Sequence, residues 1–82
     1  MFHRILSVTP LPGYKLKALF KTGEERLYDA STLEETWPVF ADLRAIPGLF
    51  ELVRVEAGGC AVVWNEFLDL SSEEIWHGGI PV

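Results

Sequence analysis

The chain has 82 residues, a formal net charge of −5 and a hydrophobic content of 49%. This length predicts one domain over residues 1–82 with a small core, because so short a chain buries only about 60% of its unfolded surface. The hydrophobic content excludes a disordered protein. No apolar run approaches the roughly 20 residues of a membrane-spanning helix, so no membrane association is expected. A single cysteine, Cys60, excludes an internal disulfide and favours a cytoplasmic protein.

Three strands are predicted in the first part of the chain, over residues 5–11, 14–20 and 25–29. In the second of them, side-chain alternation places Leu16, Ala18 and Phe20 on one face. The turn at Gly23 fits a two-residue loop, or a three-residue loop in which Gly23 takes the left-handed conformation. The register of this strand pair therefore stays open.

A helix is predicted over residues 39–46, because apolar residues recur there at helical spacing: Val39, Phe40, Leu43 and Ile46. Before it, Thr32 is a candidate helix cap with Glu35 at the capping-box position. Pro38 interrupts that first helical segment, so it is expected to be about one turn long.

A β-hairpin is the clearest element, over residues 50–64 and folded about Gly58-Gly59. A two-residue turn there predicts three facing pairs, which are Ala57 with Cys60, Val55 with Val62, and Val53 with Trp64. Trp64 is expected in the core. A short apolar segment follows over residues 65–70, and Ser71 or Ser72 is expected to cap a last helical turn over residues 73–77.

The predicted fold class is α+β. We expect an antiparallel or mixed sheet of about five strands, in the order β-β-β-α-β-β-α, with short helices packed on one face. Most connections are short, which favours antiparallel pairing. The expected core is small and the chain has many apolar residues, so an oligomer or a protein partner that would bury more of them is also favoured.

No group of residues has the pattern of a catalytic or metal site, so an enzyme is not expected. His3 and His77 lie near opposite ends of the chain, outside any metal-ligand motif. Cys60 is expected to be a small packed residue and not a nucleophile. The glycine pairs lack the spacing of a phosphate-binding loop, so no cofactor is expected. At Asp29 and Asp69, turn or capping hydrogen bonds are expected.

Aromatic and apolar residues outside the predicted core define a candidate partner surface: Trp37, Trp76 and Ile80. Such residues either pack back on the domain or meet a partner, since aromatic side chains are enriched at the centres of interfaces. They favour a non-catalytic protein–protein interaction domain. Its partner would be another small, basic protein or a second copy of this chain.

A nucleic-acid-binding module is the alternative function, because one cationic cluster is present: Lys15, Lys17, Lys21, Arg26 and Tyr28. On neighbouring strands, these side chains would form a basic face with an aromatic ring, as proteins that bind single strands use. Interleaved acids such as Glu24 and Glu25 weaken this hypothesis, and the negative net charge of the chain repels phosphates.

A series of motifs along the chain resembles a family of short bacterial domains of unknown function. The motifs lie at residues 5–16, 20–29, 47–55, 58–64 and 69–70, and they include G-E-x-R-x-Y-D and G-G-x-x-V-V-W. The resemblance implies a compact α+β fold. It also implies that the gene lies beside that of another small protein, in an arrangement like a toxin–antitoxin pair. Some relatives carry an added helix-turn-helix domain, for which this chain has no room, and no catalytic residues carry over.

Overall fold

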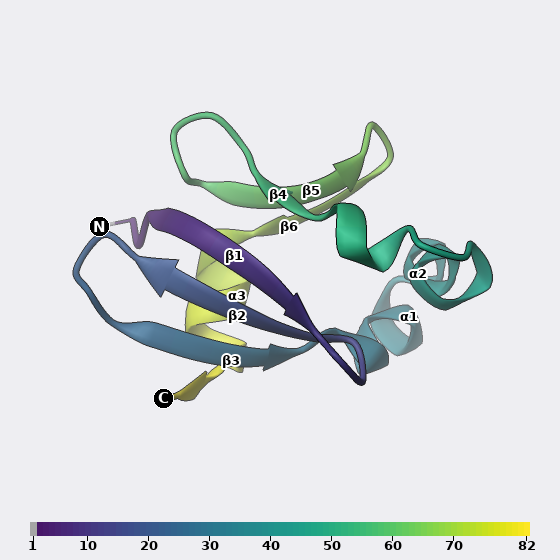
Figure 1. Cartoon of the computed structure of the whole chain (residues 1–82), viewed down its shortest axis with the longest axis horizontal. Coiled ribbons are helices and arrows are strands. Elements are labelled where there is room, and N and C mark those ends of the chain that lie inside the picture. Colours follow the sequence, from purple (N-terminus) through teal and green to yellow (C-terminus); the bar gives the residue numbers. More distant parts are fainter. Residues whose placement is uncertain (1) are drawn as a thin grey trace.

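The computed structural model describes residues 2–82, which form an α+β fold (Figure 1). The strands are β1 (Ile5–Leu11), β2 (Lys15–Phe20), β3 (Glu25–Asp29), β4 (Arg54–Val55), β5 (Ala61–Asn65), β6 (Leu68–Ser71) and β7 (Ile80–Pro81). The α-helices are α1 (Leu33–Thr36), α2 (Asp42–Ala45) and α3 (Ser72–Gly78). Short 3-10 turns are η1 (Ala30–Thr32), η2 (Pro38–Ala41) and η3 (Phe50–Leu52).

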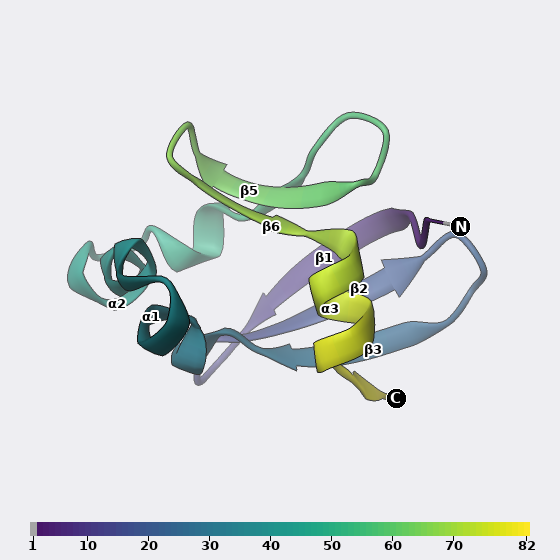
Figure 2. The same cartoon turned by 180° about the vertical axis from the view of Figure 1, so that it is seen from behind.

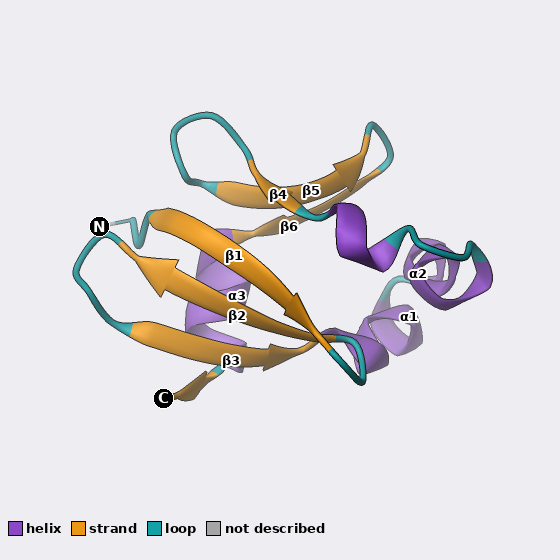
Figure 3. Ribbon diagram, viewed as in Figure 1, coloured by secondary structure: helices purple, strands orange, loops and turns teal. Residues whose placement is uncertain are grey.

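The strands form two antiparallel sheets, in the orders β1-β2-β3-β7 and β4-β5-β6 (Figure 3). The predicted class is confirmed, but the prediction of one sheet of about five strands is wrong. Two short strands, β6 and β7, were missed in the sequence, and each extends a different sheet. The sheets meet where the N–H of Ile5 donates to the carbonyl of Gly59 at 2.8 Å. A Cβ on Gly59 would lie 2.6 Å from the carbonyl oxygen of Ile5, so this contact requires glycine.

The first two hairpins follow the predicted alternation. Leu16, Ala18 and Phe20 of β2 are buried, and the strand faces β3 in regular register. At the β2–β3 turn, the N–H of Phe20 donates to the carbonyl of Glu24, which leaves three residues in the loop. Gly23 has φ +93°. The three-residue loop with a left-handed glycine is therefore the form that this turn takes.

The hairpin of β4 and β5 has the predicted register, since Val55 faces Val62. Its turn is longer than predicted, because the last ladder bond runs from the N–H of Glu56 to the carbonyl of Ala61. Cys60 thus lies in the loop, and its side chain is exposed. The expectation of a packed Cys60 is wrong for this reason.

The helical region is broken into short pieces, and the single helix predicted over residues 39–46 is wrong. Within it, η2 ends at Ala41 and α2 begins at Asp42. Phe40 and Leu43 are buried as expected, whereas Val39 and Ile46 are exposed. A break between two short segments rotates the apolar stripe, so its outer members face solvent. Thr32 makes no side-chain cap, because its backbone is already in the helical region, with φ −96° and ψ −2°, whereas a capping residue is extended. Asp29, which is extended, caps the preceding turn η1.

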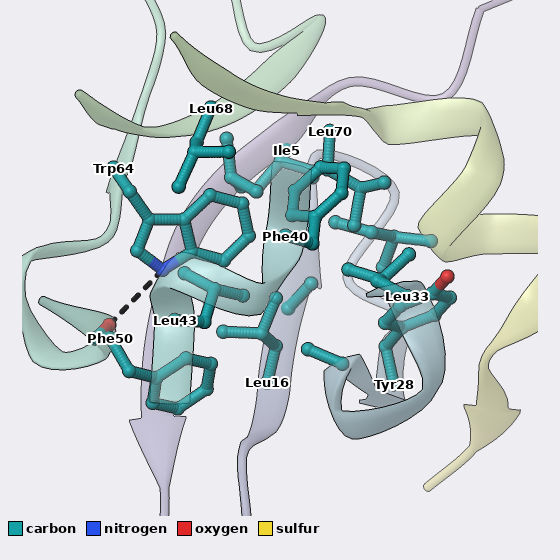
Figure 4. Packing of buried hydrophobic residues seen from close by; sticks show 14 of the residues in the cluster. Ile5, Leu16, Tyr28, Leu33, Phe40, Leu43, Phe50, Trp64, Leu68 and Leu70 are labelled. Carbon is teal, nitrogen blue, oxygen red and sulfur yellow. Dashed lines mark hydrogen bonds between the residues drawn. The ribbon is translucent and has the colours of Figure 1, made fainter. Parts of the chain in front are cut away.

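One core lies between the two sheets and the helical region (Figure 4). Trp64 is buried as predicted, and its indole N–H donates to the carbonyl of Phe50 at 3.2 Å. Phe40 and Phe50 lie beside this indole, with 6.0 and 6.3 Å between ring centroids. The bond to the carbonyl satisfies the polar atom of an otherwise apolar side chain, as buried indoles require.

The end of the chain returns to the first sheet. Ser71 caps α3, because its Oγ accepts a hydrogen bond from the N–H of Glu74 at 3.1 Å. After α3, β7 pairs with β3, so that Leu27 faces Ile80. Among residues 2–82, no helix has the length and apolar character needed to cross a membrane.

Candidate functional site

A groove of about 410 Å³ lies between η2 and β6. Figure 2 shows β6, α1 and α3 on the same side of the molecule. The residues that line the groove come from η2 and the residue before it, from β6 and the residue before it, and from α3: Trp37, Val39, Phe40, Phe67, Asp69, Leu70, Ser71 and Glu74. Segments far apart in the sequence therefore form this surface.

The groove has a buried apolar floor and exposed apolar walls. Phe40 and Leu70 form the floor and also belong to the core. On the walls, the exposed fractions of Trp37, Val39 and Phe67 are 45%, 51% and 74%. Three large apolar side chains in one groove are more than the scattered exposed residues that soluble proteins carry.

Local backbone structure holds the two aromatic walls in place. Trp37 has an extended conformation, with φ −128° and ψ 95°, and Pro38 begins η2 directly after it. Phe67 lies in a turn that is closed by a side chain, because Oδ1 of Asn65 accepts from the N–H groups of both Phe67 and Leu68 at 2.9 Å. This Asx turn places Phe67 at the tip of the β5–β6 hairpin, away from the core.

Two carboxylates give the groove a negative charge. Glu74 accepts a hydrogen bond from the hydroxyl of Tyr28 at 3.1 Å. Burial of the Tyr28 hydroxyl, and then the charge of Glu74, raise the pKa of Tyr28 far above its ordinary value. Asp69 is exposed and has no ion-pair partner within residues 2–82.

The two aspartates that were predicted to make turn or capping bonds differ. Oδ1 of Asp29 accepts from the N–H of Ser31 at 3.0 Å and from its hydroxyl at 2.6 Å. These hydrogen bonds lower the pKa of Asp29. The capping prediction is confirmed at Asp29. At Asp69 the side chain instead lies in the groove.

The predicted partner residues do not form one surface. Trp76 is half-buried, because its indole packs against the rings of His3 and Phe20 and the guanidinium of Arg26. Ile80 is 67% exposed on β7. The C-terminal segment that carries Ile80 lies away from the α1 region that carries Trp37 (Figures 1 and 2). Of the three residues, only Trp37 lies in the groove.

The cationic residues are also divided. Lys15 and Lys17 lie on the outer face of the first sheet, where they pair with Asp29 at 3.7 Å and Glu25 at 3.5 Å. Arg26 faces Ala18 and lies against Trp76, and Tyr28 is buried, so both belong to the opposite face. Lys21 lies in the β2–β3 turn. The structure does not gather these five side chains into one basic face.

Sequence reasoning missed Val39 and Phe67 as surface residues. Val39 shares the apolar spacing of a helix, so the pattern assigns it to the core. Phe67 follows Asn65 at a spacing that suits an Asx turn, and an aromatic residue at such a turn is the one signal that could have identified it.

A second groove, of about 430 Å³, lies between the β1–β2 turn and the segment after α2. Tyr14 lines it with φ 60°, in the left-handed region, and its ring packs edge-on against Phe50 at 5.3 Å between centroids. Arg44 and Glu51 give its walls both signs of charge. Within residues 2–82, no three His, Cys, Asp or Glu side chains are grouped so that they could hold a metal ion.

Fold and groove together define a small α+β domain with an acidic, aromatic surface. The family described as "Protein of unknown function (DUF2442)" matches residues 5–81, and the chain belongs to this family. No curated protein and no solved structure matches the chain.

Proposed function

We propose that this chain is a non-catalytic protein–protein interaction domain whose binding surface is the groove between η2 and β6. The observation that carries the proposal is the exposure of Trp37, Val39 and Phe67 above an apolar floor. Burying such side chains contributes about 25 cal/mol per Å² of apolar surface removed from water. Aromatic side chains in a concave site are also the residues that most often dominate binding energy.

The charge of the groove favours a basic partner. Asp69 is unpaired within residues 2–82 and lies beside the apolar walls, and the whole chain has a net charge of −5. In a symmetric dimer through this surface, the acids of one copy would face the same groove of the other copy, whose lining includes Asp69 and Glu74 and no lysine or arginine. Complementary charge sets specificity and speeds association, so a heterologous partner with lysine or arginine beside an apolar anchor fits better.

A small protein encoded beside this chain is the partner that we propose to test first, in line with a toxin–antitoxin-like pair. The two proteins are co-expressed, and the complex is isolated by size-exclusion chromatography. We expect one co-eluting peak. Two separate peaks, with this chain strictly monomeric, would contradict the proposal, and a peak of this chain alone at twice its mass would assign the surface to a second copy.

Two substitutions locate the surface. Phe67→Ser and Ile80→Ser each remove an exposed apolar side chain, with exposed fractions of 74% and 67%, but only the first lies in the groove. We expect Phe67→Ser to weaken binding at least about tenfold, which corresponds to about 1.4 kcal/mol. Ile80→Ser is the matched control and should bind like the unmodified chain. Equal effects of both substitutions would rule out the groove.

A further inference from the structure

One wall of the groove is the open edge of a sheet. The three-stranded sheet has the order β4-β5-β6, so β6 has a neighbour on one side only. The N–H of Ser72 donates to the carbonyl of Cys60 at 2.8 Å, which makes these two residues a hydrogen-bonded pair. Along an antiparallel ladder, hydrogen-bonded residue pairs alternate with pairs that are not hydrogen-bonded to each other. Leu70 therefore bonds to β5, whereas the backbone groups of Asp69 and Ser71 point away from it.

These outward groups are unpaired. They point away from the β5–β6 ladder, and outside that ladder the N–H and C=O of Asp69 and the N–H of Ser71 have no hydrogen-bond partner in the part of the chain that the structure describes. Both residues are exposed, and both line the groove. A row of unpaired backbone groups at a sheet edge is a template for pairing with another chain.

The two edges of the other sheet are protected differently. One edge is β7, which has two residues, and one of them is Pro81, which has no N–H to donate. The other edge is β1, which contains Pro10 and whose Ile5 N–H already donates to the carbonyl of Gly59. Short strands and proline are the usual ways to prevent pairing at an edge. In contrast, β6 has four residues, and its sequence has no proline. It is also the strand that borders exposed aromatic side chains.

We propose that the partner binds by strand addition, as an extended segment that pairs with the open edge of β6. The inference rests on the proposed function and names the form of the bound segment. About four of its residues would lie along β6, since a strand rises about 3.3 Å per residue. Every second side chain would enter the groove between Trp37 and Phe67. A lysine or arginine beside them would pair with Asp69.

An added strand fits the open edge of β6 better than a bound helix does. A helix satisfies its own backbone and leaves the groups of Asp69 and Ser71 unpaired, whereas an added strand uses them. Main-chain hydrogen bonds then contribute affinity, and the pocket beside the strand selects alternate side chains. The acidic edge selects a cationic segment and disfavours a second copy of this acidic chain.

Two substitutions at one position separate backbone pairing from side-chain contact. Asp69→Ala removes the carboxylate and keeps the N–H, whereas Asp69→Pro removes both. Proline is tolerated at an edge position whose N–H faces away from the ladder, which is the position of Asp69. Strand addition predicts that Asp69→Pro binds at least about tenfold more weakly than Asp69→Ala. Circular dichroism and thermal unfolding check that both variants fold.

The probe is a library of random twelve-residue peptides, selected on the unmodified chain and counter-selected on Phe67→Ser. We expect enriched peptides with apolar residues at every second position and at least one lysine or arginine. Enriched peptides with helical spacing, or equal binding to Asp69→Ala and Asp69→Pro, would overturn strand addition and leave the groove as a binding surface. Enrichment that does not depend on Phe67, or none at all, would overturn both proposals.

A measurement on the unmodified chain covers the case in which Asp69→Pro does not fold. Amide hydrogen exchange is followed by NMR, with and without the tightest peptide. In the free protein, the amides of Asp69 and Ser71 should exchange faster than the amide of Leu70. On binding, the Asp69 amide should slow at least about tenfold. An unchanged Asp69 amide in a saturated complex would overturn strand addition.

Discussion

The imidazole ring of His3 stacks on the indole ring of Trp76, with 3.9 Å between ring centroids and 9° between ring planes. The guanidinium of Arg26 lies 3.9 Å from the centroid of the same indole. The backbone N–H of His3 donates to Glu73 at 2.6 Å, and its ring nitrogen Nδ1 lies 3.1 Å from the same carboxylate. This cluster ties the start of the chain to β3 and α3, so Trp76 contributes to the packing of the fold.

The two exposed or half-exposed tryptophans should therefore respond differently to the same change. Trp76→Ala removes contacts to His3, Phe20 and Arg26, and we expect it to lower the free energy of unfolding by about 2–4 kcal/mol. Trp37→Ala removes an exposed side chain and should cost less than about 1 kcal/mol, but it should weaken partner binding. Urea unfolding measures the free energy of unfolding of both variants. Equal losses of stability in Trp76→Ala and Trp37→Ala would contradict the different roles assigned to the two tryptophans.

The carboxylate of Glu73 should make stability depend on acidic pH. Hydrogen bonds from the backbone N–H of His3, and then from its ring, lower the pKa of Glu73. A lowered pKa stabilises the folded state above the ordinary carboxyl value of about 4.3, and this stabilisation is lost as the pH falls through the folded pKa. Glu73→Gln should therefore lower the urea midpoint at pH 7, and the difference from the unmodified chain should shrink toward pH 3.

Glu35→Gln is the control for that experiment, because Glu35 is exposed on α1 and has no ion pair within residues 2–82. It should leave the urea midpoint nearly unchanged at both pH values. A Glu73→Gln midpoint that matches the unmodified chain at pH 7 would show that the contact to His3 contributes nothing in solution.

Two glycines with positive φ should differ in their tolerance of alanine. Gly23 has φ +93°, and apart from its chain neighbours no atom of residues 2–82 lies within 4 Å of the place that a Cβ would take, so Gly23→Ala should cost about 1 kcal/mol from backbone strain alone. Gly59 has φ +77°, and a Cβ there would meet the backbone of Ile5 at 2.6 Å. Gly59→Ala should cost about 2–4 kcal/mol, because it also separates the two sheets. Thermal unfolding of both variants tests whether Gly59→Ala is more destabilising than Gly23→Ala.

The parts of the fold that the sequence predicted are those in which one face is buried and the turn is glycine-rich. Alternation in β2 identified Leu16, Ala18 and Phe20, since a strand with one buried face repeats every second residue. The Gly58-Gly59 turn set the register of β4 and β5, although not the length of the loop. By contrast, β7 has only two residues, and the alternation in β6 extends over only four residues.

The site was harder to predict, because its residues come together only through tertiary structure. Trp37 was expected at the surface, where the structure places it, but it was grouped with Trp76. The side chain that covers Trp76 is His3, which lies more than seventy positions earlier in the sequence, so no local pattern could reveal the contact. β6 is an edge strand because it pairs with β5 on one side and with no strand on the other. The short apolar segment over residues 65–70 gives no sign of this pairing.

The hydroxyl of Tyr28 should make the fold sensitive to alkaline pH. Its burial and its hydrogen bond to Glu74 raise the pKa of Tyr28, so the folded state favours the protonated form. A raised pKa stabilises the folded state below the unfolded value of about 10, and this stabilisation is lost as the pH rises above it. Tyr28→Phe should cost about 0.5–1.5 kcal/mol at pH 7, because the hydrogen bond to Glu74 is lost. Between pH 9 and pH 11, the variant should lose less stability than the unmodified chain.

Tyr14→Phe is the control, because Tyr14 lies at the surface of the other groove. Parallel pH profiles for the unmodified chain and Tyr28→Phe would show that the hydroxyl is ionised as easily in the folded state as in the unfolded one.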